Sequence, residues 1–404
     1  FYSSFEYGHH IGEPGYRREP FPNWFLASFL WLFYRPIPGL TKEQVLDNVD
    51  ILNASVNVNV LWAAILFFAV WALCRSLFSY SLLADFVAIN SIIISQASFV
   101  KFEYSNLNTE LPAAALIVVF SLSLTFSSLK KTPVSYLFVG LSYGLLVLTK
   151  ASGAYIGLVV IPLIALILSG KVRSLYGFLS AKFLRVLLLT TLGLSLVVTP
   201  WVCRNYFEFG RPAIAEGGGR VLWIRSEFNK INSYQYLGAF YAYSPEILRD
   251  SVWENIFGNN ASQLECGGDL QLHNRGQQCD LDYLSLARAG NIDLFDKVVS
   301  LYDRGKKALP EKMKAEAIAA GVDFDYDKEG KQIFLEGFRN DPFKHFLLTF
   351  PLAWRGIWSF ALSSWVGIIV NFLVMVNLIF LPLTAIVLKN KNLLLLSLVP
   401  ACYF

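Results

Sequence analysis

Long uncharged apolar runs alternate with short polar connections along most of this chain. Six runs lack Asp, Glu, Lys and Arg altogether, and a seventh, 76–100, holds only Asp85. A run of about 18 or more apolar residues is long enough to cross the hydrocarbon core of a bilayer as a helix. The pattern therefore predicts an all-α polytopic membrane protein with about eight transmembrane helices. The uncharged runs are 51–74, 111–129, 132–149, 151–170, 186–203 and 356–388.

The same pattern divides the chain into four parts. We expect an outer segment 1–50, a bundle of six spans over 51–203, a large outer loop of mixed structure over 204–355, and C-terminal spans over 356–404. The aromatic run 21–36 is short for a full crossing, so it predicts an interfacial or re-entrant helix and leaves open whether it crosses. The chain begins at Phe1 and stops inside an apolar run, which indicates a longer protein cut at both ends.

Charge separates cleanly between alternate connections. One set of connections has nine basic residues and no acid, and 29 of the 30 acidic residues belong to the other set or its flanks. Short basic loops stay in the cytoplasm, so the acidic connections are predicted to face the periplasm or cell exterior. The basic set is Arg75, Lys130, Lys131, Lys171, Arg173, Lys182, Arg185, Lys389 and Lys391.

Composition agrees with a membrane protein. Hydrophobic residues make up 55% of the chain and charged residues 16%, which is too apolar for a soluble domain of 404 residues. The basic residues are scattered or sit beside the spans, so we expect membrane lipids and no nucleic acid among the partners.

The outer connection 101–110 supplies a candidate carboxylate and a candidate cation. Glu110 is the last residue before an apolar run, where it either complements the helix dipole or serves as a base at the helix mouth. Lys101 either holds a phosphate or is an interfacial lysine with its amine in the head-group region.

Two further groups of charge lie beside predicted membrane segments. Arg17, Arg18 and Glu19 precede the aromatic run, and paired guanidinium groups suit a phosphate, although an ordinary charged flank is the alternative. Arg204 and Asn205 follow a span on the outer side, against the positive-inside tendency, which calls for an anionic lipid or substrate.

The cysteines divide into two kinds. Cys266 and Cys279 lie in the predicted outer loop, an oxidising compartment, and their spacing suits a disulfide. The others, Cys74, Cys203 and Cys402, lie in or beside apolar runs and are typical of small buried hydrophobes.

Four segments resemble the polytopic glycosyltransferases that use lipid-phosphate sugars, in particular the bacterial protein O-mannosyltransferases and aminoarabinose transferases. In chain order they are YRREPFP at 16–22, YSNLNTE at 104–110, GLLVLTK at 144–150 and PWVCRNYFEFG at 200–210. The resemblance covers 16–210, and the last segment is the most specific. Two departures stand out: the family's Arg-Pro-Pro reads Arg18-Glu19-Pro20 here, and the family's principal catalytic Asp lies upstream of that segment, before Phe1.

The resemblance implies an inverting transfer of a hexose or pentose from a polyprenyl-phosphate donor to an acceptor hydroxyl of a lipid, glycan or protein. A carboxylate would take the acceptor proton, with Glu110 assisting, and Arg17, Arg18, Glu19, Lys101, Arg204 and Asn205 would bind substrate. No cofactor is certain, no metal ligand is identified, and a divalent metal stays open. The location implied is the bacterial inner membrane, with the site facing the periplasm.

Two other classes remain open. A transporter or flippase of lipid-linked substrates predicts charged or broken helices at mid-membrane, where this chain offers only Asp85. A non-catalytic membrane scaffold would use the loop 204–355 to bind a partner, and would leave Glu110 and Arg204 without a shared ligand.

Overall fold

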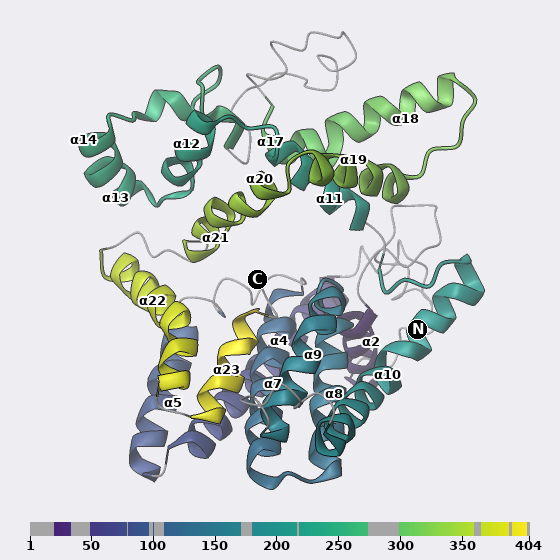
Figure 1. Ribbon diagram of the computed structural model, residues 1–404, viewed down its shortest axis with the longest axis vertical. Coiled ribbons are helices and arrows are strands. Elements are labelled where there is room, and N and C mark those ends of the chain that lie inside the picture. Colours follow the sequence, from purple (N-terminus) through teal and green to yellow (C-terminus); the bar gives the residue numbers. More distant parts are fainter. Residues whose placement is uncertain are drawn as a thin grey trace. The chain divides into compact units, whose positions relative to one another are not determined.

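The computed structural model is mostly helical over the residues that it describes (Figure 1). Those residues are 20–33, 49–78, 80–96, 100, 109–170, 180–215, 218–273, 299–358, 365–387 and 390–401. No strand occurs among them, so the predicted all-α class is confirmed for this part of the chain. They form two compact units, divided after Ala215 and again before Val376.

The first unit is a bundle of apolar helices. Its members are α2 (Pro20–Phe33), α4 (Val49–Leu77), α5 (Ser81–Ser95), α7 (Glu110–Lys130), α8 (Pro133–Val147), α9 (Gly153–Ser169), α10 (Ala181–Phe209) and α23 (Lys391–Ala401). Helix α22 (Trp365–Val387) contains the boundary between the units.

In the part of the chain that the structure describes, fewer helices are long enough to cross a membrane than the eight or so predicted for the whole chain. Among the described residues three are long and apolar enough, namely α4, α7 and α10. A fourth is gained if the two halves of α22, Gly367–Val376 and Phe380–Val387, which are bent by 45°, count as one span. Helices α5, α8 and α9 are apolar but shorter. For α8 and α9, the turn between Val147 and Gly153 takes up residues that the hydropathy pattern had assigned to spans. These helices indicate an integral membrane protein.

Two helix boundaries differ from the prediction for local reasons. Arg75 was expected at the turn of a hairpin, but α4 continues through it to Leu77. The arginine instead pairs with Asp85 of α5, with 3.1 Å between Nε and Oδ1. Helix α10 was expected to end near residue 203, but it extends to Phe209 and ends at Gly210, whose φ of 71° is the left-handed conformation that suits glycine.

An apolar stripe on α10 lies open on the surface of the bundle. Its members recur every fourth residue, which places them on one face of the helix, and each is exposed in the protein. A comparable stripe runs along α5. Contact with lipid tails accounts for these faces. The stripes are Leu184, Leu188, Leu192 and Leu196 on α10, and Leu82, Phe86, Ile89 and Ile93 on α5.

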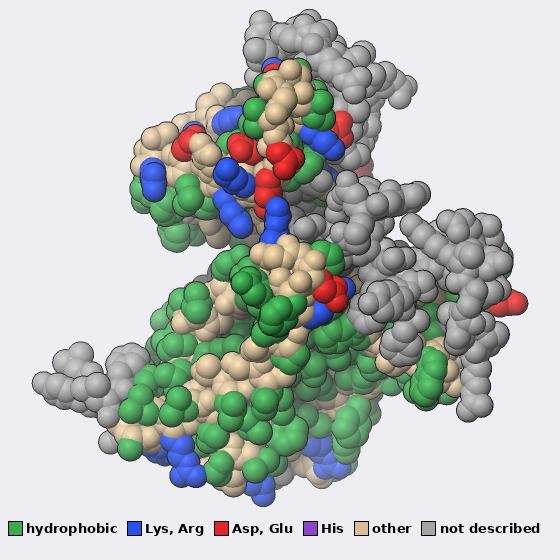
Figure 2. All heavy atoms as spheres, turned by 90° about the vertical axis from the view of Figure 1, so that its right-hand side faces the viewer, with side chains coloured by type: hydrophobic (Ala, Val, Ile, Leu, Met, Phe, Trp, Pro, Cys, Tyr) green, Lys and Arg blue, Asp and Glu red, His purple; other side chains and the backbone are tan. Residues whose placement is uncertain are grey.

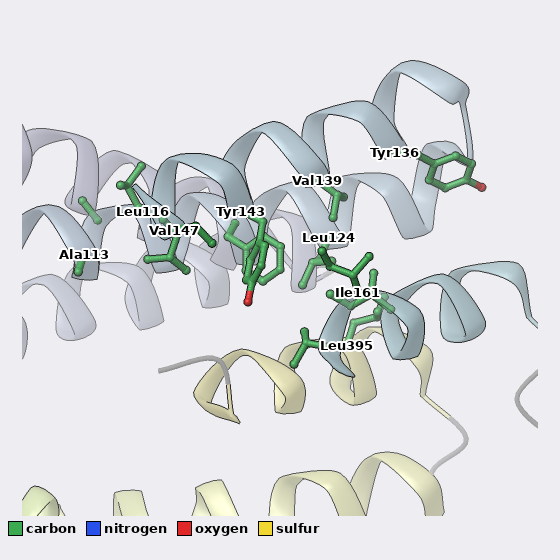
Figure 3. Close-up of a cluster of buried hydrophobic side chains, with 14 of the residues drawn as sticks. Ala113, Leu116, Leu124, Tyr136, Val139, Tyr143, Val147, Ile161 and Leu395 are labelled. Carbon is green, nitrogen blue, oxygen red and sulfur yellow. The ribbon is translucent and has the colours of Figure 1, made fainter. Parts of the chain in front are cut away.

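The core of the bundle lies between α4, α7, α8, α9 and α23. Figure 3 shows part of it, with Leu124, Tyr143 and Ile161 among the clustered side chains and Leu395 of α23 beside them. Tyr143 is buried, and its hydroxyl donates to the backbone carbonyl of Gly153 at 2.7 Å. The core therefore ties the ends of α8 and α9 together.

The second unit comprises residues 216–375, somewhat less than the predicted loop 204–355 at its start and more at its end. Its longer helices are α11 (Gly218–Phe228), α12 (Ser233–Tyr243), α18 (Leu309–Ala319), α19 (Tyr326–Asn340), α20 (Pro342–Leu347) and α21 (Thr349–Ile357). Shorter helical turns are α13 (Glu246–Leu248), α14 (Glu254–Phe257) and α17 (Leu301–Asp303), with π turns at Arg249–Trp253 and Arg304–Ala308 and 3-10 turns at Ala261–Leu264 and Gln271–His273.

Helices α11 and α19 approach each other closely in this unit. A Cβ added to Gly219 would lie 2.3 Å from the Cα of Asp327, and one added to Gly330 would lie 2.2 Å from the carbonyl oxygen of Gly219. The Asp327 side chain accepts a hydrogen bond from the Gly219 amide at 2.8 Å. Asp327 thus links α11 to α19, and the nearby Asp325 side chain caps the start of α19.

Candidate functional site

Helices α8 and α10 run parallel and in register. Thr190 Oγ1 donates to the carbonyl of Tyr136 at 3.4 Å, Gly140 faces Gly193, and Gly144 faces Val197. Further along, Leu148 and Trp201 share one buried cluster. From each of these pairs to the next, the contact moves about one turn along both helices. Arg204 lies three residues beyond Trp201 on α10, and Lys150 lies two residues beyond Leu148 in the turn after α8.

Lys150 forms an ion pair with Glu110 at this end of the bundle. The Lys150 ammonium lies 2.5 Å from Glu110 Oε2, and the two side chains are 28% and 38% exposed. Glu110 is the first residue of α7, so its charge complements the helix dipole as well. The pair joins two connections that are forty residues apart in sequence, 101–110 and the α8–α9 turn.

The turn that carries Lys150 is held by several hydrogen bonds. The Lys150 amide donates to the carbonyl of Leu146 at 2.8 Å, and Thr149 Oγ1 donates to the carbonyl of Leu145 at 2.8 Å. The bond from the Tyr143 hydroxyl to Gly153 closes the other side. These bonds hold the backbone of the turn that carries Lys150 in one conformation.

The start of α2 packs against this turn. The Phe21 amide donates to the carbonyl of Leu148 at 3.2 Å. Phe25 stacks on Trp62 of α4 with 4.3 Å between ring centroids, and Trp24 meets Trp201 of α10 edge-on at 5.2 Å. The aromatic helix predicted at 21–36 thus bridges the α8–α9 turn and α10 within the described range Pro20–Phe33.

Arg204 lies on α10 beside the same aromatic group. Its guanidinium carbon is 4.8 Å from the ring centroid of Trp201 and 5.0 Å from that of Phe209, at cation–π distance. One guanidinium nitrogen lies 2.6 Å from Glu208. The arginine side chain is about one-third exposed at 32%, so it is positioned by its neighbours and still reachable.

Asn205 has a role in holding the chain after α10. It is fully buried, accepts a hydrogen bond from Arg204 at 3.0 Å, and donates to the carbonyl of Ala213 at 2.7 Å. The Trp201 indole nitrogen donates to the carbonyl of Ile214 at 2.7 Å. The sequence reasoning proposed Asn205 as a substrate ligand, whereas this geometry suits a residue that positions Arg204.

Basic side chains gather at the opposite end of the bundle. Lys130 and Lys131 end α7, and Lys182 and Arg185 lie in the first turns of α10. Figure 2 shows Lys and Arg at one end of the apolar helical unit. The described bundle thus has a basic end and an end of mixed charge, which carries Glu110, Lys150, Arg204 and Glu208.

Several predicted residues lie outside the described part of the chain. Arg17, Arg18 and Glu19 precede Pro20, and Lys101 lies in 101–108, so their proposed roles stay predictions. Cys266 is disulfide-bonded, but Cys279 is also outside the described residues, and the pairing of the two stays a prediction.

Lys150 is the residue that sequence reasoning missed. The sequence showed it as a break between two apolar runs, inside a segment similar to Gly-Leu…Leu-Thr-Lys. An isolated cation in an uncharged stretch from 132 to 170 needs a partner, and that need was the available signal.

The site has no metal-binding group in its described part: no three His, Cys, Asp or Glu side chains in the described residues gather closely enough to hold an ion. Comparisons of the chain with protein-family models, with curated proteins and with solved structures found no match.

Proposed function

We propose that this chain is a membrane glycosyltransferase that moves a sugar from a polyprenyl-phosphate donor to an acceptor hydroxyl. The observation that carries the proposal is the Glu110–Lys150 ion pair together with the neighbouring cluster of Leu148 and Trp201, against which Arg204 packs. Segments 144–150 and 200–210, the end of 104–110 and the start of α2 from 16–22 meet there, and these are the segments that resemble the family.

The site offers cations for the donor phosphate. Lys150 and Arg204 are each paired with a carboxylate, and both pairs are partly exposed. An exposed ion pair contributes little, about 0 to 1 kcal/mol, so the singly charged phosphodiester of the donor can replace the carboxylate at low cost. Arginine binds phosphate in a bidentate fork and lysine as a point charge.

Donor binding and proton transfer are linked, because the donor phosphate replaces Glu110 as the partner of Lys150. When the donor phosphate takes Lys150, Glu110 is released toward the acceptor. A carboxylate then accepts the acceptor hydroxyl proton while the new bond from oxygen to the sugar C1 forms on the face opposite the leaving group. The bond from C1 to the phosphate oxygen breaks, its electron pair leaves with the polyprenyl phosphate, and the configuration inverts.

The charge pattern also supports a location. The basic end with Lys130, Lys131, Lys182 and Arg185 suits the cytoplasmic side, which puts Glu110 and Arg204 at the outer side of the membrane. We propose the bacterial inner membrane, with about eight spans in total and residues 204–355 on the periplasmic side. Lipid-linked sugars are used on that face.

The geometry does not favour an ion-coupled transporter. Asp85 was the acidic residue within a predicted span. It pairs with Arg75 near the α4–α5 turn, and the two side chains are 35% and 41% exposed. The pair sits at a helix hairpin instead of mid-membrane, where a coupling ion would bind.

A transfer assay tests the proposal. Membranes from cells producing the protein receive a radiolabelled polyprenyl-phosphate sugar or, as a control, the same sugar on a nucleotide. We expect label to move to an acceptor from the polyprenyl-phosphate donor alone. Transfer from the nucleotide sugar in membranes free of polyprenyl phosphate would contradict the proposal, and so would the absence of transfer from either donor.

A further inference from the structure

A cavity of about 650 Å3 lies within the second unit and is lined by residues of that unit alone. Its volume is in the range of small-molecule sites in proteins. Tyrosines of α12 form part of the wall, the π turn and α14 supply charged groups, and the end of α21 contributes Arg355 and Trp358.

The frame around this cavity is held by tryptophans. The Trp354 indole nitrogen donates to the carbonyl of Phe240 and to Ser244 Oγ, each at 3.1 Å, and that of Trp253 donates to Ser244 Oγ at 2.9 Å. These bonds tie α12, the π turn and α21 to one serine. The cavity therefore has a fixed wall before any ligand enters.

Trp358 differs from these two tryptophans. It is 7% exposed and lines the cavity, but its indole nitrogen has no hydrogen-bond partner among the described residues. A buried donor without an acceptor costs free energy, and such groups are rare in folded proteins. A ligand oxygen in the cavity would satisfy it.

Hydrogen bonds and ring contacts hold the other polar groups of the cavity wall in place. The Tyr241 hydroxyl donates to Glu254 Oε1 at 3.2 Å, which fixes one carboxylate. The Arg355 guanidinium carbon lies 5.1 Å from the ring centroid of Tyr243, and the Tyr243 hydroxyl is 3.4 Å from Nδ1 of His273. Donors and acceptors are thus both presented beside aromatic rings.

The charges restrict what this cavity can bind. Four carboxylates line it, those of Glu246, Asp250, Glu254 and Glu265, against the two guanidinium groups of Arg249 and Arg355. An anion would face an excess of negative charge, and a simple cation would leave the Trp358 N–H without an acceptor. Hydroxyl groups fit both sets, because each donates to a carboxylate and accepts from an N–H.

We infer that this cavity binds an uncharged carbohydrate, with the Trp358 indole N–H and Arg355 donating to its hydroxyl oxygens and Glu254 accepting from its hydroxyl groups. The tyrosine rings offer apolar faces for the C–H side of a sugar ring. This inference does not depend on the transfer reaction proposed above, since binding needs no donor and no turnover.

Calorimetric titration of the purified protein with disaccharides tests the inference. The probes are uncharged mannobiose, cellobiose and diacetylchitobiose, with digalacturonate as the anionic and the glucosamine disaccharide as the cationic comparison. We expect at least one uncharged probe to bind more tightly than either charged one. No binding of any uncharged probe, or tighter binding of a charged one, would overturn the inference.

Variants locate the binding in the cavity. Trp358→Phe keeps an aromatic ring but removes the N–H, and should weaken binding about 3- to 10-fold, the effect of one hydrogen bond. Trp365→Phe, a half-exposed tryptophan outside the cavity wall, is the matched control and should leave binding unchanged. If Trp358→Phe fails to fold, Glu254→Gln replaces it, because Glu254 lines the cavity and is the carboxylate assigned to accept from the ligand hydroxyl groups. Unchanged affinity in the folded variant would place the ligand elsewhere and refute the inference.

Discussion

At the scale of single residues, the pairing of Glu110 with Lys150 changes how each is understood. From sequence, Glu110 had two roles open to it, a dipole cap or a base, and Lys150 was a break between spans. The structure joins them at 2.5 Å. Sequence could supply both residues but not the pair, because contact between connections forty residues apart depends on how α7 and α8 pack.

Replacing Glu110 tests its proposed part in proton transfer. Glu110→Gln keeps the size of the side chain and removes its charge. If the carboxylate serves as a general base, turnover with a polyprenyl-phosphate sugar should fall about 100-fold or more, with little change in donor binding. Glu208→Gln, which alters the carboxylate beside Arg204, is the control and should retain most turnover. Full activity of the Glu110→Gln protein would remove this residue from the mechanism.

His273 should make the second unit sensitive to acid. Burial lowers the pKa of His273 from 6.5 to about 4. The nearby charge of Arg355 lowers it as well, whereas the hydrogen bond with the Gln235 carbonyl raises it. The unfolded state therefore binds a proton between these values while the folded state does not. Stability should be full above about pH 6.5 and fall as the pH drops toward 4, by at most about 3 kcal/mol.

Hydrogen exchange of α12 between pH 7 and pH 4.5 measures this effect, after correction for the intrinsic exchange rate. His273→Gln, which does not titrate, should flatten the dependence. An equal loss of protection in both proteins would assign the acid sensitivity to other groups.

At the scale of helices, the close approach of α8 and α10 positions the candidate site. Apolar periodicity predicted both helices, and α7 matches its predicted span to within one residue at each end. The alternation of spans already predicts that α8 and α10 are parallel. Their register could not be predicted, because the residues around Gly140 and Gly193 lie in uniformly apolar stretches. Register came from small residues that let the backbones meet.

Gly140→Val should therefore disturb the site from a distance. A Cβ at Gly140 would lie 2.0 Å from the Thr190 carbonyl oxygen, so the helices must separate. We expect a lower unfolding temperature and weaker binding of polyprenyl phosphate. Gly153→Ala is the control, since its Cβ would have ordinary contacts at 3.4 Å or more. Equal stability of the two variants would show that close α8–α10 contact is dispensable.

At the scale of the whole molecule, the charge pattern predicts which connections face each side of the membrane. Sequence could predict an all-helical membrane protein, but it could not predict the lengths of the individual helices, since hydropathy does not reveal how many residues the tight turns use. It also could not place the carbohydrate cavity, whose lining spans residues 241–358 and includes no recognisable motif.

Cysteine labelling tests the sidedness. Single cysteines at Ser174 and Ser262, in a background with the native cysteines replaced, are exposed to a membrane-impermeant maleimide in spheroplasts. The proposed orientation expects labelling at Ser262 and protection at Ser174 until the membrane is opened. The reverse pattern would invert the scheme and move Glu110 to the cytoplasmic side.

The most direct test of the central claim compares polyprenyl-phosphate binding at the two ends of the bundle. Lys150→Ala with Arg204→Ala removes two cations from the candidate site, and Lys182→Ala with Arg185→Ala removes two from the basic end. Native mass spectrometry of the purified proteins measures the bound lipid. We predict that binding falls about 10-fold or more in the first double variant, because charge-assisted bonds to phosphate are lost, and stays near the unaltered level in the second. Equal binding by both double variants would contradict the account.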